Sequence, residues 1–158
     1  MAERYQVIPR TLCFVRCNGK VLLIEYAARK GPMQGYYNGI GGHIEHGEGI
    51  IESANREILE EAGIAPADTK LKGVIHFLNF FGKNTIVFVT VSTVESEVVI
   101  ESDEGKLHWV APQDLDKVNV IKDVALMLEK IGSIGDDEVF TAKSEFDGGA
   151  NLLSFDFE

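Results

Sequence analysis

Apolar residues alternate with polar ones, or form short runs, along most of the chain, and this pattern predicts β-strands. Near the start, residues 5–17 are predicted as a strand, Asn18-Gly19 as a tight turn and Lys20–Glu25 as the returning strand. Gly82–Asn84 is predicted as a second turn. The other predicted strands are Leu71–Phe80, Thr85–Val94, Lys106–Val110, Val139–Lys143 and Asn151–Phe157, the last two forming a hairpin around Gly148-Gly149.

Helical periodicity is confined to two segments. Residues 49–62 form the first predicted helix, with Gly63 as the residue that closes it, and Val120–Ile131 forms the second. Pro112–Leu115 is predicted as a helical turn, and the glycine-rich residues 29–42 as a loop or a short irregular strand. Because strands and helices do not alternate regularly, we expect an α+β fold with a mixed β-sheet rather than a doubly wound sheet.

Length and composition fit one globular domain spanning residues 1–158. The sequence has 158 residues, 45% hydrophobic and 25% charged, which is ordinary for a globular protein. The formal net charge is −10 and there is no long basic run, so we expect no nucleic acid polymer as partner. The N-terminal residues have no apolar signal core, and no apolar run approaches the ~18 residues of a membrane span. We therefore expect a cytoplasmic protein without a membrane partner.

The two cysteines, Cys13 and Cys17, lie in an apolar, strand-like stretch. Their even spacing puts both on the same face of the strand. No second cysteine pair or His-x₃-His partner completes a zinc site. We expect buried free thiols, which agrees with a reduced cytosolic compartment.

The predicted helix 49–62 carries carboxylates close to its apolar stripe. At about 100° per residue, the stripe covers roughly 120° and contains Ile50, Ile51, Ala54, Ile58 and Ala62. With the first of these at zero, Glu61 lies at about 20°, Glu57 at about 340° and Glu60 at about 280°. Two of the three carboxylates therefore border or enter the face that packs on the core.

This arrangement is costly without a counter-ion. Like charges four residues apart destabilise a helix by roughly 0.2–0.5 kcal/mol, and partial burial adds to the cost. A divalent cation resolves the conflict, because Mg²⁺ and Mn²⁺ prefer hard oxygen ligands. The alternative is a solvated acidic face paired with Arg56, but Glu61 lies too close to the apolar stripe and one arginine cannot neutralise three carboxylates. Carboxylates beside a glycine-rich loop therefore suggest phosphate chemistry.

Residues 42–64 resemble the Nudix box at every fixed position. The matching pattern is Gly42-x₅-Glu48-x₇-Arg56-Glu57-Ile58-x-Glu60-Glu61-x-Gly63-Ile64. In that family the box forms a loop–helix–loop on an α/β/α sandwich with a mixed β-sheet, and the resemblance implies the same fold here. It also implies an enzyme, a nucleoside polyphosphate pyrophosphohydrolase.

The resemblance implies a role for each box residue. Glu48 would pair with Arg56, which orients Glu57, and the carbonyl of Gly41 would be a further metal ligand. The two histidines of the box, His43 and His46, fall at variable positions and are expected to be exposed. The glutamates that would coordinate the divalent metals are Glu57, Glu60 and Glu61.

Outside the box, two segments resemble 8-oxo-dGTP diphosphatases of the MutT type. Asn38, in Tyr37–Gly42, stands where those enzymes use an asparagine to bind the purine, although it could instead only cap a turn. Glu104, at the end of Glu101–Glu104, would be an extra metal ligand or general base, or else plain solvated surface. Trp109 is expected to pack in the core rather than stack on a base.

Asp123 matches one member of an aspartate pair that reads the base in animal 8-oxo-dGTP enzymes. The second member is Val124 here, and a nearby tryptophan of those enzymes is replaced by Ile121. These departures concern the base and leave the phosphate chemistry untouched. Asn38 and Asp123 are thus the predicted substrate-binding residues, and 8-oxo-dGTP is a candidate substrate rather than an assigned one.

The resemblance implies hydrolysis of a nucleoside triphosphate to a monophosphate and pyrophosphate, with Mg²⁺, or Mn²⁺ as substitute, and with Glu57 or Glu104 as base. One alternative is another substrate, such as ADP-ribose or a dinucleoside polyphosphate. ADP-ribose enzymes often carry a proline past the box, which the segment 79–83 lacks. A second is a non-catalytic nucleotide sensor, but such domains usually lose box glutamates. The chain is expected to be a monomer or a homodimer.

Overall fold

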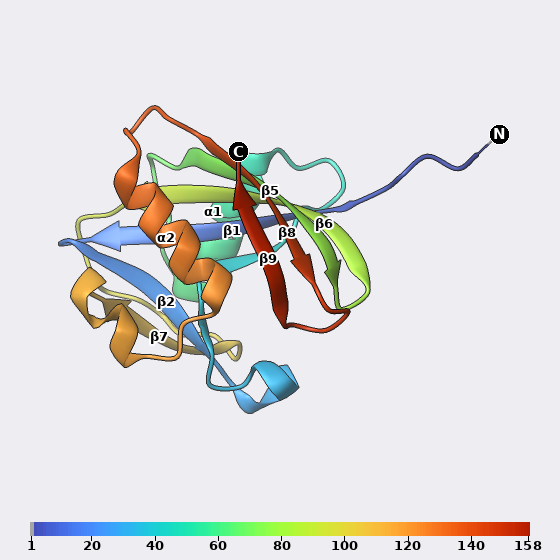
Figure 1. The fold of residues 1–158 in the computed structure, drawn as a ribbon. Coiled ribbons are helices and arrows are strands. Elements are labelled where there is room, and N and C mark those ends of the chain that lie inside the picture. Colours follow the sequence, from blue (N-terminus) through green and yellow to red (C-terminus); the bar gives the residue numbers. More distant parts are fainter. Residues whose placement is uncertain (1) are drawn as a thin grey trace.

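The computed structural model describes residues 2–158, which form one curled, mixed β-sheet flanked by helices (Figure 1). Seven strands are hydrogen-bonded in the order β3-β2-β1-β6-β5-β8-β9, while β4 pairs with β1 and β7 with β2. The pairs β1–β6 and β5–β8 are parallel and the others antiparallel. The strands are β1 (Ile8–Cys17), β2 (Lys20–Tyr26), β3 (Tyr37–Asn38), β4 (Ile40–His43), β5 (Lys70–Phe80), β6 (Lys83–Thr93), β7 (Gly105–Val110), β8 (Phe140–Phe146) and β9 (Leu152–Phe157).

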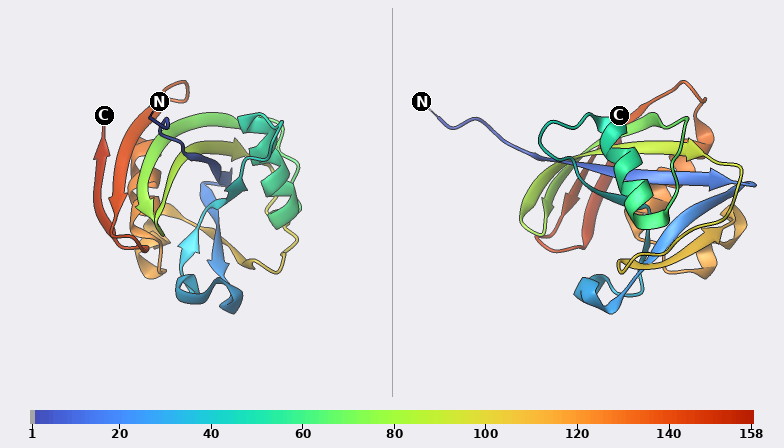
Figure 2. Two further views of the ribbon diagram at one scale, coloured as in Figure 1. Left: turned by 90° about the vertical axis from the view of Figure 1, so that its right-hand side faces the viewer. Right: turned by 180° about the vertical axis from the view of Figure 1, so that it is seen from behind.

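Two α-helices cover opposite faces of this sheet (Figures 1 and 2). Side chains of β1 alternate between two cores, with Leu12 and Phe14 in the core under α2 and Cys13 and Val15 in the core under α1. This layering confirms the predicted α+β sandwich with a mixed sheet. The helices are α1 (Ile50–Ala62) and α2 (Lys122–Ser133), with two 3₁₀ segments, η1 (Ala28–Met33) and η2 (Pro112–Lys117).

The predicted elements are all present, with differences at their ends. The turn between β5 and β6 lies at Phe81-Gly82, one residue earlier than predicted, because both residues adopt positive φ and Lys83 already pairs with Phe80. The first strand begins at Ile8 rather than at residue 5. Helix α2 begins at Lys122, since the preceding residue is extended. Strand β8 continues to Phe146, beyond the predicted end.

Side-chain packing agrees with three further predictions. Cys13 and Cys17 are buried and free. His43 and His46 are exposed. Trp109 packs against the core under α1, and its indole N–H donates to the Glu97 carbonyl at 2.9 Å. Within residues 2–158, none of the helices has the length and apolar character that crossing a membrane requires.

Two contacts of β1 position the candidate site. Strand β4 runs antiparallel to β1, with Gly41 opposite Leu12 and Gly42 opposite Thr11. Helix α1 follows β4 after a short loop and packs across both strands. The glycine pair at the start of the box is therefore held between the sheet and the carboxylate-bearing helix.

Candidate active site

Helix α1 buries a face that contains polar as well as apolar side chains. Its buried residues are Ser53, Ala54, Glu57, Ile58 and Ala62. The predicted position of Glu57 within this face is confirmed, and Glu61 is half-buried beside it. Ile51 was wrongly assigned to the buried stripe, since it lies in the first turn, before the helix meets the sheet, and is 38% exposed. Gly63 ends the helix in the left-handed conformation, with its N–H donating to the Leu59 carbonyl.

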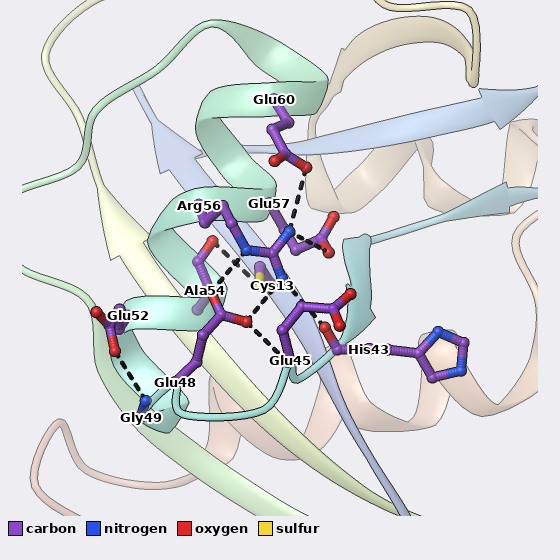
Figure 3. A network of polar contacts seen from close by, with 10 residues as sticks. All are labelled: Cys13, His43, Glu45, Glu48, Gly49, Glu52, Ala54, Arg56, Glu57 and Glu60. Atoms are coloured by element: carbon purple, nitrogen blue, oxygen red, sulfur yellow. Dashed lines mark hydrogen bonds and ion pairs between the residues drawn. The ribbon is translucent and has the colours of Figure 1, made fainter.

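Arg56 joins the carboxylates of the box loop and the helix into one network (Figure 3). Its guanidinium donates to both oxygens of Glu48, through Nε at 2.6 Å and Nη2 at 2.9 Å. Nη1 donates to Glu57 at 3.0 Å and to Glu60 at 3.2 Å, and Nη2 also donates to the carbonyl of His43 at 3.1 Å. The predicted Glu48–Arg56 pair and a contact of Arg56 with Glu57 are thus present, and the role of Arg56 in orienting Glu57 stays a prediction.

Glu57 lies directly against the backbone of Gly42. A Cβ atom at Gly42 would overlap the Glu57 carboxylate, so only glycine leaves room for it. Burial raises the pKa of Glu57, while the hydrogen bond and charge of Arg56 oppose that rise. The box glycine therefore lets a buried carboxylate approach the end of β4.

We expect Gly42→Ala to lower kcat by about 10²-fold while the fold is retained. The added methyl group would push the Glu57 carboxylate away from its place beside Arg56, and a displacement of about 1 Å at a catalytic group has an effect of that order. Steady-state kinetics would measure the loss and circular dichroism the fold. Gly132→Ala is the matched control, because a Cβ there meets no atom within 4 Å. Unchanged kcat in Gly42→Ala would contradict the close fit.

Glu61 is the most strongly perturbed carboxylate of the helix. Burial raises its pKa to about 8, and the negative charges of Glu57 and Glu104 add to the rise. The backbone of Gly41 and the positive charge of Lys30 act in the opposite direction. A half-buried carboxyl group beside two other carboxylates favours either its proton or a cation. The arginine network does not supply that cation, because the guanidinium of Arg56 is bonded to Glu48, Glu57 and Glu60 and forms no ion pair with Glu61 in the described residues.

Glu104 belongs to the loop before β7 and lies close enough to influence Glu61. It is 21% exposed and forms ion pairs with Arg29, at 2.6 Å, and with Lys30. Both cations come from η1, so the two loops are tied together across the site. The reading of Glu104 as plain solvated surface is therefore wrong, whereas its role as metal ligand or base stays a prediction.

The donor set fits a divalent metal ion, although no three His, Cys, Asp or Glu side chains within residues 2–158 already surround one point. Carboxylates without a cation between them repel, which agrees with their spread-out arrangement. The fit rests on Glu61, whose pKa is raised by burial and then by Glu57 and Glu104, so that a hard cation would relieve burial and repulsion together. Glu60 is exposed, and its carboxylate is bonded to Arg56 at 3.2 Å.

A cavity of about 290 Å³ is lined by Gly41 at the box and by Lys30, the ion-pair partner of Glu104, although none of the four glutamates belongs to its wall. It reaches from Gly41 at the box to the start of α2, and its wall includes Asn38, Tyr26 and Asp123. The two predicted substrate-binding residues are thus brought together. Aromatic side chains form much of its apolar lining, namely Phe77, Phe80, Phe81 and Phe146.

Asn38 both shapes a turn and lines the cavity. Its side-chain oxygen accepts from the Gly39 N–H at 2.7 Å, and its amide nitrogen donates to the Tyr26 hydroxyl at 2.9 Å. Thr85, on β6, also lines the cavity, and its buried hydroxyl has no hydrogen-bond partner in the described part of the chain. The cavity can therefore offer polar groups to a ligand between aromatic walls.

Asp123 is a buried carboxyl group without a cation partner in residues 2–158. Burial raises its pKa to about 6, against hydrogen bonds from the backbone of Val124 and of Asp123 itself. The carboxyl group is thus poised to change protonation in the neutral range, and a ligand donor or acceptor could select either form.

We expect Asp123→Asn to remove a pH dependence of stability. The folded protein keeps this proton up to pH about 6, whereas an ordinary aspartate loses it near 3.8, so stability falls as pH rises through this window. Above pH 6 the variant should be more stable than the wild type by about 3 kcal/mol, and near pH 4 the two should be similar. Urea unfolding between pH 4 and 8 measures the difference. Parallel pH profiles for the two proteins would contradict the assignment.

The structure adds residues that the sequence did not indicate. Arg10, Tyr26 and Lys30 line the cavity near the box, and Arg29 and Lys30 hold Glu104. Lys30 belongs to the glycine-rich segment that was predicted as a loop or a short irregular strand. Arg10 lies on a strand with no local signal, because its role depends on the pairing of β1 with β4.

Comparison with known proteins places this geometry in a family. The family model described as NUDIX domain matches residues 8–129. The uncharacterized Nudix hydrolase YvcI of Bacillus subtilis is 33% identical over 113 residues, which covers 68% of each chain. An oxidized purine nucleoside triphosphate hydrolase of Danio rerio is 35% identical over 111 residues, covering 68% of this chain and 67% of that protein.

Solved structures show the same fold along nearly the whole chain. The crystal structure of the mutator MutT protein from Bacillus halodurans has a TM-score of 0.80 at 25% identity and covers 96% of this chain and 98% of that chain. The NUDIX domain of Shewanella oneidensis NrtR, complexed with ADP ribose, has a TM-score of 0.70 at 13% identity, covering 82% and 88%. The second likeness concerns the fold alone.

Proposed function

The chain belongs to the NUDIX domain family, and from this we propose that it hydrolyses a phosphoanhydride bond in a nucleoside triphosphate, giving the monophosphate and pyrophosphate. It is a Nudix hydrolase, as its relatives indicate. The observation that carries the proposal is the half-buried carboxyl group of Glu61, which has Glu57 and Glu104 near it. The adjoining cavity, whose wall includes Gly41, is lined by aromatic and polar side chains that suit a nucleoside. The cofactor we propose is Mg²⁺, with Mn²⁺ as a substitute.

The residues proposed to hold the metal are Glu61 of α1 and the neighbouring carboxylates. They are Glu57, Glu60, Glu61 and Glu104, together with the carbonyl of Gly41. When bound, the metal would neutralise charge on the phosphates and lower the pKa of a bound water. Arg56 would not contact substrate, since its five N–H groups are engaged by Glu48, Glu57, Glu60 and the carbonyl of His43.

The remaining chemistry belongs to side chains of this chain. Glu57 or Glu104 would accept the proton of the attacking water, because each is a carboxylate whose position is fixed by cations. Arg56 would keep Glu57 in place through its contact at 3.0 Å, with Glu48 holding the arginine in turn. Water would attack an internal phosphorus and release pyrophosphate.

For the base, we propose a purine, with an oxidised purine such as 8-oxo-dGTP as the candidate. The support comes from Asn38 and Asp123 in one cavity and from the Danio rerio relative, which is an oxidized purine nucleoside triphosphate hydrolase. The same wall contains Val124 where the animal enzymes have a second aspartate, and Ile121 where they have a tryptophan. Because these two base-reading groups are missing, ordinary purine nucleotides remain competing substrates.

A panel of substrates tests this proposal. The wild type would be incubated with Mg²⁺ and with Mn²⁺ in the presence of each nucleoside triphosphate, 8-oxo-dGTP, ADP-ribose and a dinucleoside polyphosphate, with products identified by chromatography. Monophosphate plus pyrophosphate from a purine triphosphate would support it. Turnover of ADP-ribose alone, or of the dinucleoside polyphosphate alone, would show that the substrate is not a nucleoside triphosphate. No turnover of any compound would favour a nucleotide-sensing domain.

A further inference from the structure

Arg10 places a positive charge in the cavity wall near the box. It lies on β1 opposite His43 of β4, two residues past Gly41. Within residues 2–158, no carboxylate forms an ion pair with its guanidinium. In a chain with a net charge of −10, a half-buried arginine in a cavity without an acidic partner is a site for an anion.

The neighbouring residues show where this charge acts. Burial raises the pKa of Tyr26, and the hydrogen bond from the Asn38 amide lowers it. The negative charge of Glu61 also raises this pKa, whereas the positive charge of Arg10 lowers it. The guanidinium is thus felt at the same hydroxyl as the Glu61 carboxylate. In the sheet, β1 pairs through Arg10 with β4, which leads into the box, and on its other edge with β6, which is followed by the Phe77-bearing β5.

The second cation of this wall is already engaged. Lys30 is paired with Glu104, and its ammonium lies 5.1 Å from the centre of the Tyr26 ring. Its charge is therefore partly neutralised within the protein. Among the cations that line the cavity, Arg10 alone has no acidic partner in the described chain.

The groups that line the cavity match the parts of a nucleotide. Aromatic side chains such as Phe77 and Phe146 can enclose a base, and the box carboxylates need metal-bound phosphates. Because β1 lies between β4 and the strands that carry the aromatic residues, the phosphate attached to the sugar would fall at Arg10. From this placement, which rests on the proposed function, we propose that Arg10 binds the nucleoside-proximal phosphate directly, without a metal ion.

This role predicts binding of the monophosphate product in the absence of metal. Affinities of AMP, dGMP, 8-oxo-dGMP, dCMP and dTMP, and of the corresponding nucleosides, would be measured by calorimetry in EDTA. We expect at least one monophosphate to bind the wild type, and Arg10→Ala to bind it about tenfold or more weakly. The affinity of the nucleoside should not change. Binding of the monophosphate should weaken with added salt in the wild type and less so in the variant.

Arg16→Ala is the matched control, because it removes the same charge from the same strand and does not line the cavity. Arg10→Lys should recover part of the affinity, since it restores the charge without the planar fork. Thermal unfolding checks that each variant is folded.

Three results would overturn the inference. One is an unchanged monophosphate affinity in a folded Arg10→Ala, and another is an equal loss for nucleoside and monophosphate, which would mean that the arginine reads the base. The third is no binding of any monophosphate by a wild type that hydrolyses triphosphates. The proposed function fails separately, if the wild type with Mg²⁺ hydrolyses no nucleotide.

Discussion

Replacing Glu61 by Gln is expected to lower kcat by about 10³-fold or more, equivalent to about 4 kcal/mol of transition-state stabilisation. The amide keeps the shape of the side chain but removes the charge that we propose as a metal ligand. Since burial and then Glu57 raise the pKa of Glu61 to about 8, the folded protein already favours a neutral group there. The variant should therefore lose kcat and keep the free energy of unfolding of the wild type. Steady-state kinetics with saturating Mg²⁺ and thermal unfolding in EDTA measure the two quantities.

Glu52→Gln is the control for this variant. Glu52 lies on the same helix and accepts a hydrogen bond from the Gly49 N–H at 2.9 Å, which glutamine can also accept. We expect its kcat to equal that of the wild type. Wild-type turnover in Glu61→Gln, or an equal loss in both variants, would show that the metal assignment is wrong.

Removing divalent metal should abolish turnover, down to the rate without enzyme. The carboxylates around Glu61 repel a triphosphate when no cation lies between them, and the net charge of −10 adds to that repulsion. The fold should persist in EDTA, because the network of Arg56 with Glu48 and Glu57 needs no metal. Activity after dialysis against EDTA, and circular dichroism of the same sample, are the measurements.

Two additions complete this experiment. EDTA previously saturated with Mg²⁺ should leave activity unchanged, which excludes an effect of the chelator itself. Excess Mg²⁺ or Mn²⁺ should restore turnover in the dialysed enzyme. Full activity in metal-free EDTA would contradict the mechanism, and a lost circular dichroism signal would mean that metal supports the fold rather than the reaction.

Much of α1 could be predicted because helix geometry depends only on local spacing. The period of 3.6 placed Glu57 and Glu61 on the core-facing side, and the structure buries the first and half-buries the second. Arg56 and Glu48 are eight residues apart, and the family resemblance supplied their pairing. Ile51 is the exception, because the packing of a first turn depends on the approach of the sheet rather than on spacing.

The cavity could not be predicted in the same way. Arg10, Lys30 and Asp123 come from β1, η1 and α2, and they meet only because the sheet curls and β4 pairs back on β1. Glycines carry little periodic signal, so the fit between Gly42 and the Glu57 carboxylate also emerges only in three dimensions. Asn38 and Asp123 were found through resemblance to known enzymes, whereas Arg10 has no counterpart in the motif.

Metal binding to the helix carboxylates is the central claim, and Mn²⁺ titration followed by electron paramagnetic resonance tests it most directly. The titration would be carried out on the wild type, Glu61→Gln and Glu52→Gln without substrate. We expect bound Mn²⁺ in the wild type, the same binding in Glu52→Gln, and binding at least about tenfold weaker in Glu61→Gln. Equal Mn²⁺ binding by Glu61→Gln and the wild type would contradict the account.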